Sequence, residues 1–151
     1  MAELTRSDVA VVVCQAEAAA LDALVLPGHR SRALRTAPDE YLFVCEPAVA
    51  AEVAREASDR IAALDDDAVV LDVSDGWAGM RLTGVDTAHA FSYVSALALP
   101  APDGFVQGDV ARVAAKVLVD DDGLTILAPA YWEDHLHARL LLDAGAEDVC
   151  A

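Results

Sequence analysis

The sequence predicts a single-domain α+β protein in which helices pack on a mixed or antiparallel sheet. The chain has 151 residues, a length that suits one domain with one continuous core. Its strand-like segments come in adjacent runs separated by single helical segments, an order typical of α+β folds. No long linker or low-complexity segment divides the chain. We therefore predict one domain over residues 1–151.

Strand and helix signals alternate through the first half of the chain. Short valine-rich runs predict buried strands, and apolar residues at every fourth position predict a helix with one buried stripe. Proline and aspartate between two strand-like runs predict a tight turn. The expected elements are a strand at 9–13, a segment at 16–26 with helix-forming composition before Pro27 and Gly28, a hairpin over 32–45, a helix over 48–64 after Pro47, and a buried strand at 68–73.

The second half repeats this logic. A Ser-Asp-Gly turn at 74–76 precedes a paired strand, and three aspartates followed by Gly123 predict another hairpin turn. Asp86 is expected in the first turn of a helix, where its charge suits the helix dipole. The expected elements are a strand at 77–82, a helix at 85–97, one extended strand at 105–119, a strand at 124–127, and a helix after Pro129 with Trp132, Leu136, Leu140 and Ala144 on its buried stripe.

The charge balance argues against a phosphate-bearing partner. The chain has 26 acidic and 10 basic residues, a formal net charge of -16, and Lys116 is its only lysine. Nucleic acids and anionic membranes bind through lysine and arginine, so neither is an expected partner. No apolar stretch is long enough to span a membrane, and Glu3 and Asp8 stand where a secretion signal would be basic. We therefore expect a cytoplasmic protein.

The cysteines and histidines do not form a recognisable metal or disulfide pattern. Cys14, Cys45 and Cys150 are odd in number and widely spaced, so we expect inert reduced thiols. His135 and His137 are two apart on a predicted helix and therefore point to different faces. The remaining candidates are isolated or suit a surface ion pair, and they are His29, His89 and the pair of Glu133 with His137. No metal site is expected.

No catalytic residue is expected either. The aspartates at 120–122 lack the alternating spacing and the distal glutamate of a calcium loop, so they predict a polar hairpin turn. The serines and cysteines do not stand in a nucleophile motif, and the glycines do not form a phosphate-binding loop. Among the few aromatic residues, Trp77 and Tyr93 lie near turns and are our candidates for lining a folate pocket or an interface. We expect Trp132 in the core.

Residues 69–75 and 80–88 resemble the signature of the aminomethyltransferase (glycine cleavage T-protein) folate-binding superfamily. The shared pattern is an Asp-x-Ser strand, an alternating strand and a Gly-x-Asp-Ala helix start, with Thr87 inserted before Ala88 here. The hairpin at 33–43 and the segments at 112–119 and 124–136 are similar to the gamma subunit of heterotetrameric sarcosine oxidase. The resemblance covers about residues 32–142, leaves 1–31 unassigned, and implies a folate-binding fold with ferredoxin-like βαββαβ elements.

The resemblance also implies what this chain lacks. Catalytic members carry a Gly-Gly and paired-aspartate turn between their last two strands, whereas residues 119–124 here have neither the Gly-Gly pair nor an apolar spacer. The implied role is a non-catalytic accessory subunit on a larger flavin- and folate-dependent amine oxidase that performs oxidative demethylation with tetrahydrofolate. In that role FAD, FMN and NAD would be bound only by partner subunits, and this chain would hold no cofactor, with tetrahydrofolate the one candidate.

Two other functions stay open from the sequence. The chain could be a stand-alone one-carbon or aminomethyl-transferring enzyme, or a small-molecule binder in a specialised pathway. It could also be a homo-oligomeric module without a ligand. Binding of tetrahydrofolate to the isolated chain would separate the first of these functions from the accessory role.

Overall fold

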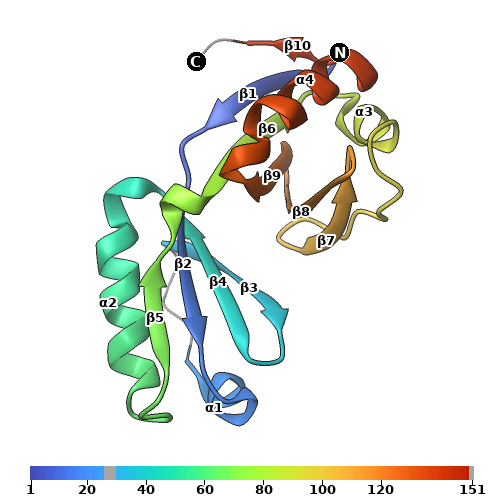
Figure 1. Ribbon diagram of the computed structural model, residues 1–151. Coiled ribbons are helices and arrows are strands. Elements are labelled where there is room, and N and C mark those ends of the chain that lie inside the picture. The colour runs from blue at the N-terminus through green and yellow to red at the C-terminus, as the bar shows by residue number, and fades with distance from the viewer. Residues whose placement is uncertain (26–29, 150–151) are drawn as a thin grey trace. The chain divides into compact units, whose positions relative to one another are not determined.

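The computed structural model describes residues 1–25 and 30–149, and these form two compact units (Figure 1). We call Asp8–Asp75 the central unit, and Met1–Ser7 together with the described chain from Gly76 onward the terminal unit. Each unit has its own sheet and its own cluster of buried side chains. The α+β class with antiparallel and mixed sheets and packed helices is confirmed, and the expectation of one domain stays a prediction. The predictions for Pro27, Gly28, His29 and Cys150 lie outside the described residues.

The central unit is an antiparallel sheet of four strands with two helices. The strand order is β3-β4-β2-β5, and the predicted hairpin is confirmed as β3 and β4. Its elements are β2 (Ala10–Gln15), α1 (Ala18–Ala23), β3 (Ser31–Ala37), β4 (Glu40–Cys45), the 3-10 turn η1 (Pro47–Val49), α2 (Ala50–Ile61) and β5 (Val69–Asp72).

Helix α2 covers one face of this sheet through the stripe that its sequence predicts. Val53, Ala57 and Ile61 are buried, and they pack with Val12 and Phe43 of the sheet. Burial of these apolar side chains is the main favourable term holding the helix to the sheet. The helix ends at Ile61 rather than Leu64. A turn follows, in which the Leu64 amide donates to the Ile61 carbonyl oxygen at 2.8 Å, and the Leu64 side chain is exposed.

Strand β5 is an edge strand, and the prediction that it is buried was wrong. It pairs only with β2 in the described sheet, so side chains on its open face meet few neighbours. Val69 is 44% exposed and Leu71 is 54% exposed, while Val70, pointing to the opposite face, packs against the core. An uninterrupted apolar run therefore identified the strand but not its position in the sheet.

The terminal unit is a six-stranded mixed sheet with the order β10-β1-β6-β9-β8-β7. Strand β1 pairs antiparallel with β6 and parallel with β10, and the other pairs are antiparallel. Strands β1 and β10 come from parts of the chain to which the sequence assigned no element. The elements are β1 (Glu3–Ser7), the 3-10 turn η2 (Ser74–Gly76) at its boundary, β6 (Trp77–Thr83), α3 (Thr87–Ser92), β7 (Phe105–Val110), β8 (Val113–Asp120), β9 (Gly123–Pro129), the 3-10 turn η3 (Ala130–Trp132), α4 (Glu133–Asp143) and β10 (Glu147–Asp148).

The segment predicted as one strand at 105–119 is instead a hairpin of β7 and β8. Its two turn residues, Ala111 and Arg112, have positive φ angles of 51° and 67°, values that usually select glycine or asparagine. The Ala111 amide donates to the Val94 carbonyl oxygen at 2.7 Å, and the Arg112 amide donates to Asp109 Oδ1 at 2.8 Å. These contacts stabilise the turn. Because it contains no glycine or asparagine, the residues typical of such turns, the sequence does not predict it.

Helix α3 is shorter than predicted, and it begins two residues later. Thr87 is its first residue and Ser92 its last, so Asp86 occupies the preceding N-cap position rather than the first turn. Beyond the helix the chain runs without regular structure to β7, and Ser95 Oγ donates to the Asp109 carbonyl oxygen at 2.7 Å. Ser95 therefore uses its side chain to bond a backbone carbonyl of another segment, beyond the end of the helix.

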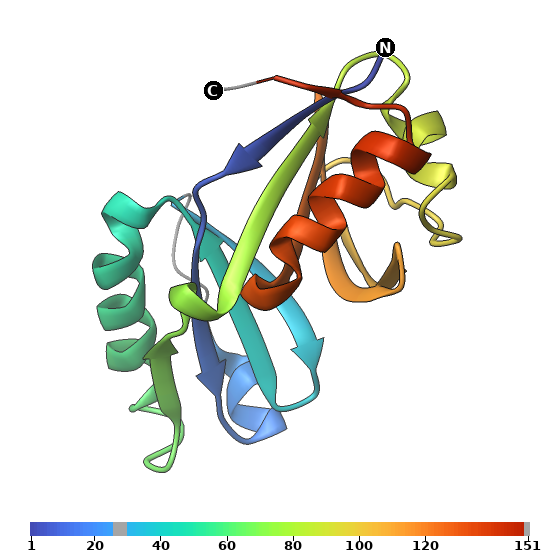
Figure 2. The same cartoon turned by 45° about the horizontal axis from the view of Figure 1, so that its top comes forward.

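Helix α4 lies along one face of the terminal unit's sheet (Figures 1 and 2). Leu136 and Leu140 have no exposed surface and pack in the cluster that includes Met80 and Ile126. Trp132 is 40% exposed, so its predicted place in the core was wrong. It precedes the regular helix, at the end of η3. Within the described residues, the helices are too short or too polar to span a bilayer.

Candidate functional site

The Asp-x-Ser motif of the resemblance is a structural lock inside the central unit. Ser74 Oγ donates to Asp72 Oδ1 at 2.5 Å and accepts from the Val11 amide at 3.0 Å, and the Ser74 amide donates to the same Asp72 oxygen at 3.0 Å. The Ser74 hydroxyl, and after it the Ser74 amide, lowers the pKa of the Asp72 carboxyl by stabilising its charged form. The motif therefore fixes how the chain leaves β5.

This lock predicts a pH dependence of stability. Because the pKa of Asp72 is lower in the folded state, its contribution is present above the unfolded pKa of about 4 and is lost as pH falls through the folded pKa. Ser74→Ala should therefore lose less stability than the parent chain between about pH 5 and pH 3. Urea unfolding at a series of pH values measures this. Identical pH slopes for the two proteins would contradict the lock, and Ser58→Ala, an exposed serine on α2, is the control.

The Gly-x-Asp motif is likewise structural and shapes the entrance to α3. Gly84 has a φ of +103°, and a Cβ there would lie 2.5 Å from the Met1 carbonyl oxygen. Thr87 Oγ1 donates to the Gly84 carbonyl oxygen at 2.7 Å, and Thr87 is buried. A side chain at position 84 would face both backbone strain and a clash, so the turn needs glycine.

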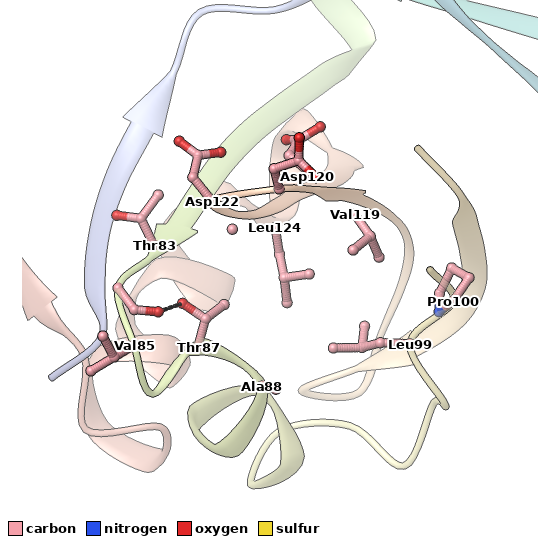
Figure 3. A pocket seen from close by; sticks show the side chains of 13 residues that line it. Thr83, Val85, Thr87, Ala88, Leu99, Pro100, Val119, Asp120, Asp122 and Leu124 are labelled. Atoms are coloured by element: carbon pink, nitrogen blue, oxygen red, sulfur yellow. Dashed lines mark hydrogen bonds between the residues drawn. The ribbon is translucent and has the colours of Figure 1, made fainter. Parts of the chain in front are cut away.

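A pocket of about 760 Å³ opens next to this turn in the terminal unit (Figure 3). It is bounded by the end of β6, the start of α3, the segment before β7 and the turn between β8 and β9. Its lining is apolar in the interior, around Leu124, and acidic at the rim, as the side chains in Figure 3 show. The lining residues are Thr83, Gly84, Val85, Thr87, Ala88, Leu99, Pro100, Val119, Asp120, Asp121, Asp122, Gly123 and Leu124.

Arg81 of β6 ties down the acidic rim. Its guanidinium binds Asp120 Oδ2 at 2.8 Å and Asp122 Oδ1 at 2.5 Å, and it donates to Thr125 Oγ1 at 3.2 Å. The predicted polar hairpin turn at Asp120–Gly123 is thereby confirmed, with an arginine clamp added. Arg81 is not among the residues that the sequence predicts for a site, although a charged residue between Met80 and Leu82 in a largely buried strand signals the need for a partner.

Removing the clamp is expected to destabilise the terminal unit. The Arg81 side chain is 31% exposed, so Arg81→Gln breaks a partly buried set of charged hydrogen bonds and should lower the free energy of unfolding by about 1–2 kcal/mol. Thermal or urea unfolding measures the change. Arg55→Gln is the matched control, because its pair with Asp59 is exposed at both ends, 68% and 70%, and should change stability by less than about 0.5 kcal/mol. Equal effects would contradict the clamp.

The pocket contains no cation of its own. None of the residues that line it is lysine, arginine or histidine, and the Arg81 guanidinium is already shared by two carboxylates. Asp121, at the tip of the turn, has no polar partner among the described residues. The rim therefore presents more negative than positive charge.

The two aromatic candidates lie away from this pocket. Trp77 is the first residue of β6, at the opposite end of the strand from Thr83, and Lys116 Nζ lies 5.3 Å from its ring centroid. Tyr93 is 62% exposed, and its hydroxyl lies 3.1 Å from His89 Nε2. Tyr93 lines a second depression of about 520 Å³, which does not include Trp77. Their roles as folate or interface contacts stay predictions.

The histidines of α4 have separate partners, as their spacing predicts. His135 Nε2 lies 3.3 Å from the Ala111 carbonyl oxygen, beside the strained turn of the β7–β8 hairpin. His137 Nε2 lies 3.6 Å from Asp148 Oδ1, and Glu133, its predicted partner, pairs instead with Arg6 at 2.5 Å. Across residues 1–25 and 30–149, no three His, Cys, Asp or Glu side chains are grouped to hold a metal ion.

Cys14 and Cys45 are buried free thiols in the central unit. Burial raises the pKa of both thiols, with Asp65 adding to the effect at Cys14 and Asp72 and Glu46 at Cys45. A raised pKa favours the protonated thiol over the nucleophilic thiolate at neutral pH. These two cysteines are therefore packing residues.

Comparison with known proteins identifies the fold. The chain matches no protein-family model and no curated protein sequence. Its structure superposes on a chain of heterotetrameric sarcosine oxidase from Corynebacterium sp. U-96, in complex with pyrrole 2-carboxylate, with a TM-score of 0.73, 19% identity, and coverage of 95% of this chain and 84% of that chain. The chain has the fold of that protein.

Two further structures place this likeness in context. The glycine cleavage system aminomethyltransferase T from Bartonella henselae matches with a TM-score of 0.71 and 16% identity, over 98% of this chain but 47% of that chain. The present chain thus spans about half of that enzyme. The regulatory subunit of aspartate kinase from Thermus thermophilus matches less well, with a TM-score of 0.51, 14% identity, and coverage of 93% and 95%. The first two matches agree with the predicted aminomethyltransferase-like fold.

Proposed function

We propose that this chain is a non-catalytic accessory subunit, like the gamma subunit of sarcosine oxidase, that docks on a larger flavin- and folate-dependent amine oxidase. The likeness to one chain of a heterotetrameric oxidase supports this role, because it extends over 84% of that chain and 95% of this one. The aminomethyltransferase match covers only 47% of the enzyme.

The observation that carries the proposal is the use made of the aspartates in the β8–β9 turn. Asp120 and Asp122 are both bound by Arg81, at 2.8 and 2.5 Å. A carboxylate acting as a general base must be able to reach its substrate proton. Here the two carboxylates bind Arg81 and hold the hairpin together, which supports a structural role for both of them in this proposal.

The chemistry of the two described pockets also argues against cofactor binding at either of them. Tetrahydrofolate ends in glutamate carboxylates, and FAD, FMN and NAD carry phosphates, so each needs nearby cations or amide donors. The residues that line the two depressions include no lysine, arginine or histidine, and the larger one has three aspartates at its rim. In this proposal the cofactors are bound by the partner subunits.

A cytoplasmic location fits this role. Cys14 and Cys45 are both free thiols, and reduced cysteines are the norm in a reducing compartment. Fractionation of the source cells would test the location directly.

Co-expression tests the accessory role. The chain is expressed with the large folate-domain subunit and the flavin subunit of an amine oxidase from the same genome, and the product is examined by native mass spectrometry. A stable complex of fixed stoichiometry is the expected result. A chain that stays monomeric at every concentration and in every combination would overturn the proposal, while self-association alone, detected by light scattering, would favour the homo-oligomeric alternative.

The alternative of a stand-alone one-carbon enzyme or small-molecule binder draws its support from the pocket, whose volume of about 760 Å³ falls within the range of ligand sites. Calorimetry of the isolated chain with tetrahydrofolate and its formyl derivative separates the two functions. We expect no measurable heat of binding. Micromolar affinity that Asp121→Lys strengthens would favour the alternative, since an added cation would attract the glutamate carboxylates.

A further inference from the structure

We infer that the pocket around Leu124 receives a cationic segment of the partner protein that carries an apolar side chain between its basic residues. This inference rests on the proposed accessory function and names the surface and chemistry of docking. Its observations are an apolar interior that lacks a cover, an acidic rim with one unpartnered carboxylate, and a framework that holds both in place (Figure 3).

The interior of the pocket presents apolar surface that the terminal unit leaves open. Val85 is 94% exposed beside the pocket, and Leu99, Val119 and Leu124 supply apolar side chains to its interior (Figure 3). A lone exposed valine is ordinary, but one that adjoins an apolar hollow is a place where a partner side chain can bury surface. An inserted aliphatic side chain would cover Val85 and fill the space above Leu124.

The rim selects the charge of the occupant. Asp120, Asp121 and Asp122 border the hollow, and Arg81 binds the carboxylates of Asp120 and Asp122. Asp121 has no polar partner within the described chain, so its carboxylate is available to a partner's arginine or lysine. The chain as a whole carries a net charge of -16, which steers a basic surface toward it and an acidic one away.

A protein segment suits this site better than a small amine does. The Asp122 side chain is 73% exposed and Val85 is nearly fully exposed, so this side of the pocket is open to solvent and the Asp122 carboxylate is hydrated. One ion pair in such a setting contributes little binding energy. Affinity requires several contacts made together with apolar burial, which a chain with alternating basic and apolar side chains supplies.

The site is already ordered before any partner arrives. Asp120 and Asp122 are held by Arg81 from the neighbouring strand. The turn before α3, which also lines the pocket, is held by the hydrogen bond from the Thr87 hydroxyl to the Gly84 carbonyl oxygen. A partner that binds such a framework loses less free energy to ordering than one that must organise a mobile loop. The pocket therefore acts as a preformed socket.

The test uses the full chain and the synthetic peptide acetyl-Arg-Leu-Arg-Leu-Arg-amide, followed by two-dimensional NMR of the labelled protein. We expect amide shifts concentrated at Val85, Asp121 and Leu124, and weaker binding as salt is raised. Asp121→Asn should weaken binding about threefold, and Val85→Ser about fivefold. The matched controls, Asp66→Asn and Val25→Ser, replace exposed residues of the central unit and should leave the affinity unchanged.

Three results would overturn the inference. The first is amide shifts scattered over the acidic surface. The second is an equal loss of peptide affinity for Asp121→Asn and Asp66→Asn. The third is agmatine binding as tightly as the peptide, which would identify the site as one for small amines. The accessory function fails separately, when co-expression yields no complex. If a complex does form and Val85→Ser with Asp121→Asn leaves its dissociation constant unchanged, docking uses another surface and only the inference falls.

Discussion

Replacing Leu136 by alanine is expected to lower the free energy of unfolding by about 3 kcal/mol. Leu136 lies in the middle of α4, has no exposed surface, and belongs to the buried cluster of the terminal unit. The truncation removes buried apolar surface and leaves a cavity that the strands beneath the helix can only partly close. Denaturant unfolding with far-ultraviolet circular dichroism measures the loss.

The control for this prediction is on the same helix. Leu142 is 78% exposed, so Leu142→Ala keeps the same chemical change and removes only the burial. Its effect should stay within about 0.5 kcal/mol. If the two variants were equally stable, α4 would not be packed on its sheet as described.

Gly123→Ala is expected to destabilise the terminal unit by about 2–3 kcal/mol. A Cβ at position 123 would lie 2.4 Å from the Leu82 carbonyl oxygen and 3.2 Å from the Thr83 Cα. These are backbone atoms of β6, which pairs with β9 in the middle of the sheet, so they cannot move without disturbing the strand pairing. The same displacement would shift the aspartate turn that borders the pocket.

Gly76→Ala serves as the control, because a Cβ there would meet nothing within 4 Å. It should change stability by less than about 0.5 kcal/mol. Thermal unfolding compares both variants with the parent chain, and a peptide titration shows whether the socket survives. A fully stable Gly123→Ala protein would mean that β6 and β9 approach each other less closely than the structure indicates.

Local patterns predicted the helices and turns best where one interaction dominates. The four-residue spacing of Val53, Ala57 and Ile61 identified α2 because a helix repeats its buried face at that interval. Proline and aspartate identified the β3–β4 turn. The β7–β8 turn escaped because Ala111 and Arg112 adopt positive φ angles that their own chemistry does not favour, and contacts from Val94 and Asp109 compensate for it.

The candidate site was less predictable than the fold. The aspartates of the β8–β9 turn were visible as a polar hairpin, but their partner Arg81 is 39 and 41 residues distant in sequence. Val85 and Leu124 are ordinary apolar residues, and only the folding of the terminal unit places them in one hollow. Trp77 and Tyr93 were chosen for their aromatic rings, yet neither lines that hollow.

By itself, the sequence determined the α+β class, the acidic character of the chain, the β3–β4 and β8–β9 hairpins, the buried face of α2 and the burial of Leu136 and Leu140 on α4. Those features depend on residue composition and on spacing along one element. The tertiary structure alone decided that β1 joins β6, that β5 lies at an edge, and that Arg81 closes the aspartate turn. These three features depend on which distant segments of the chain pair with one another. The free energy of that pairing comes from burial of apolar side chains across the whole sheet, which a local sequence pattern does not reveal.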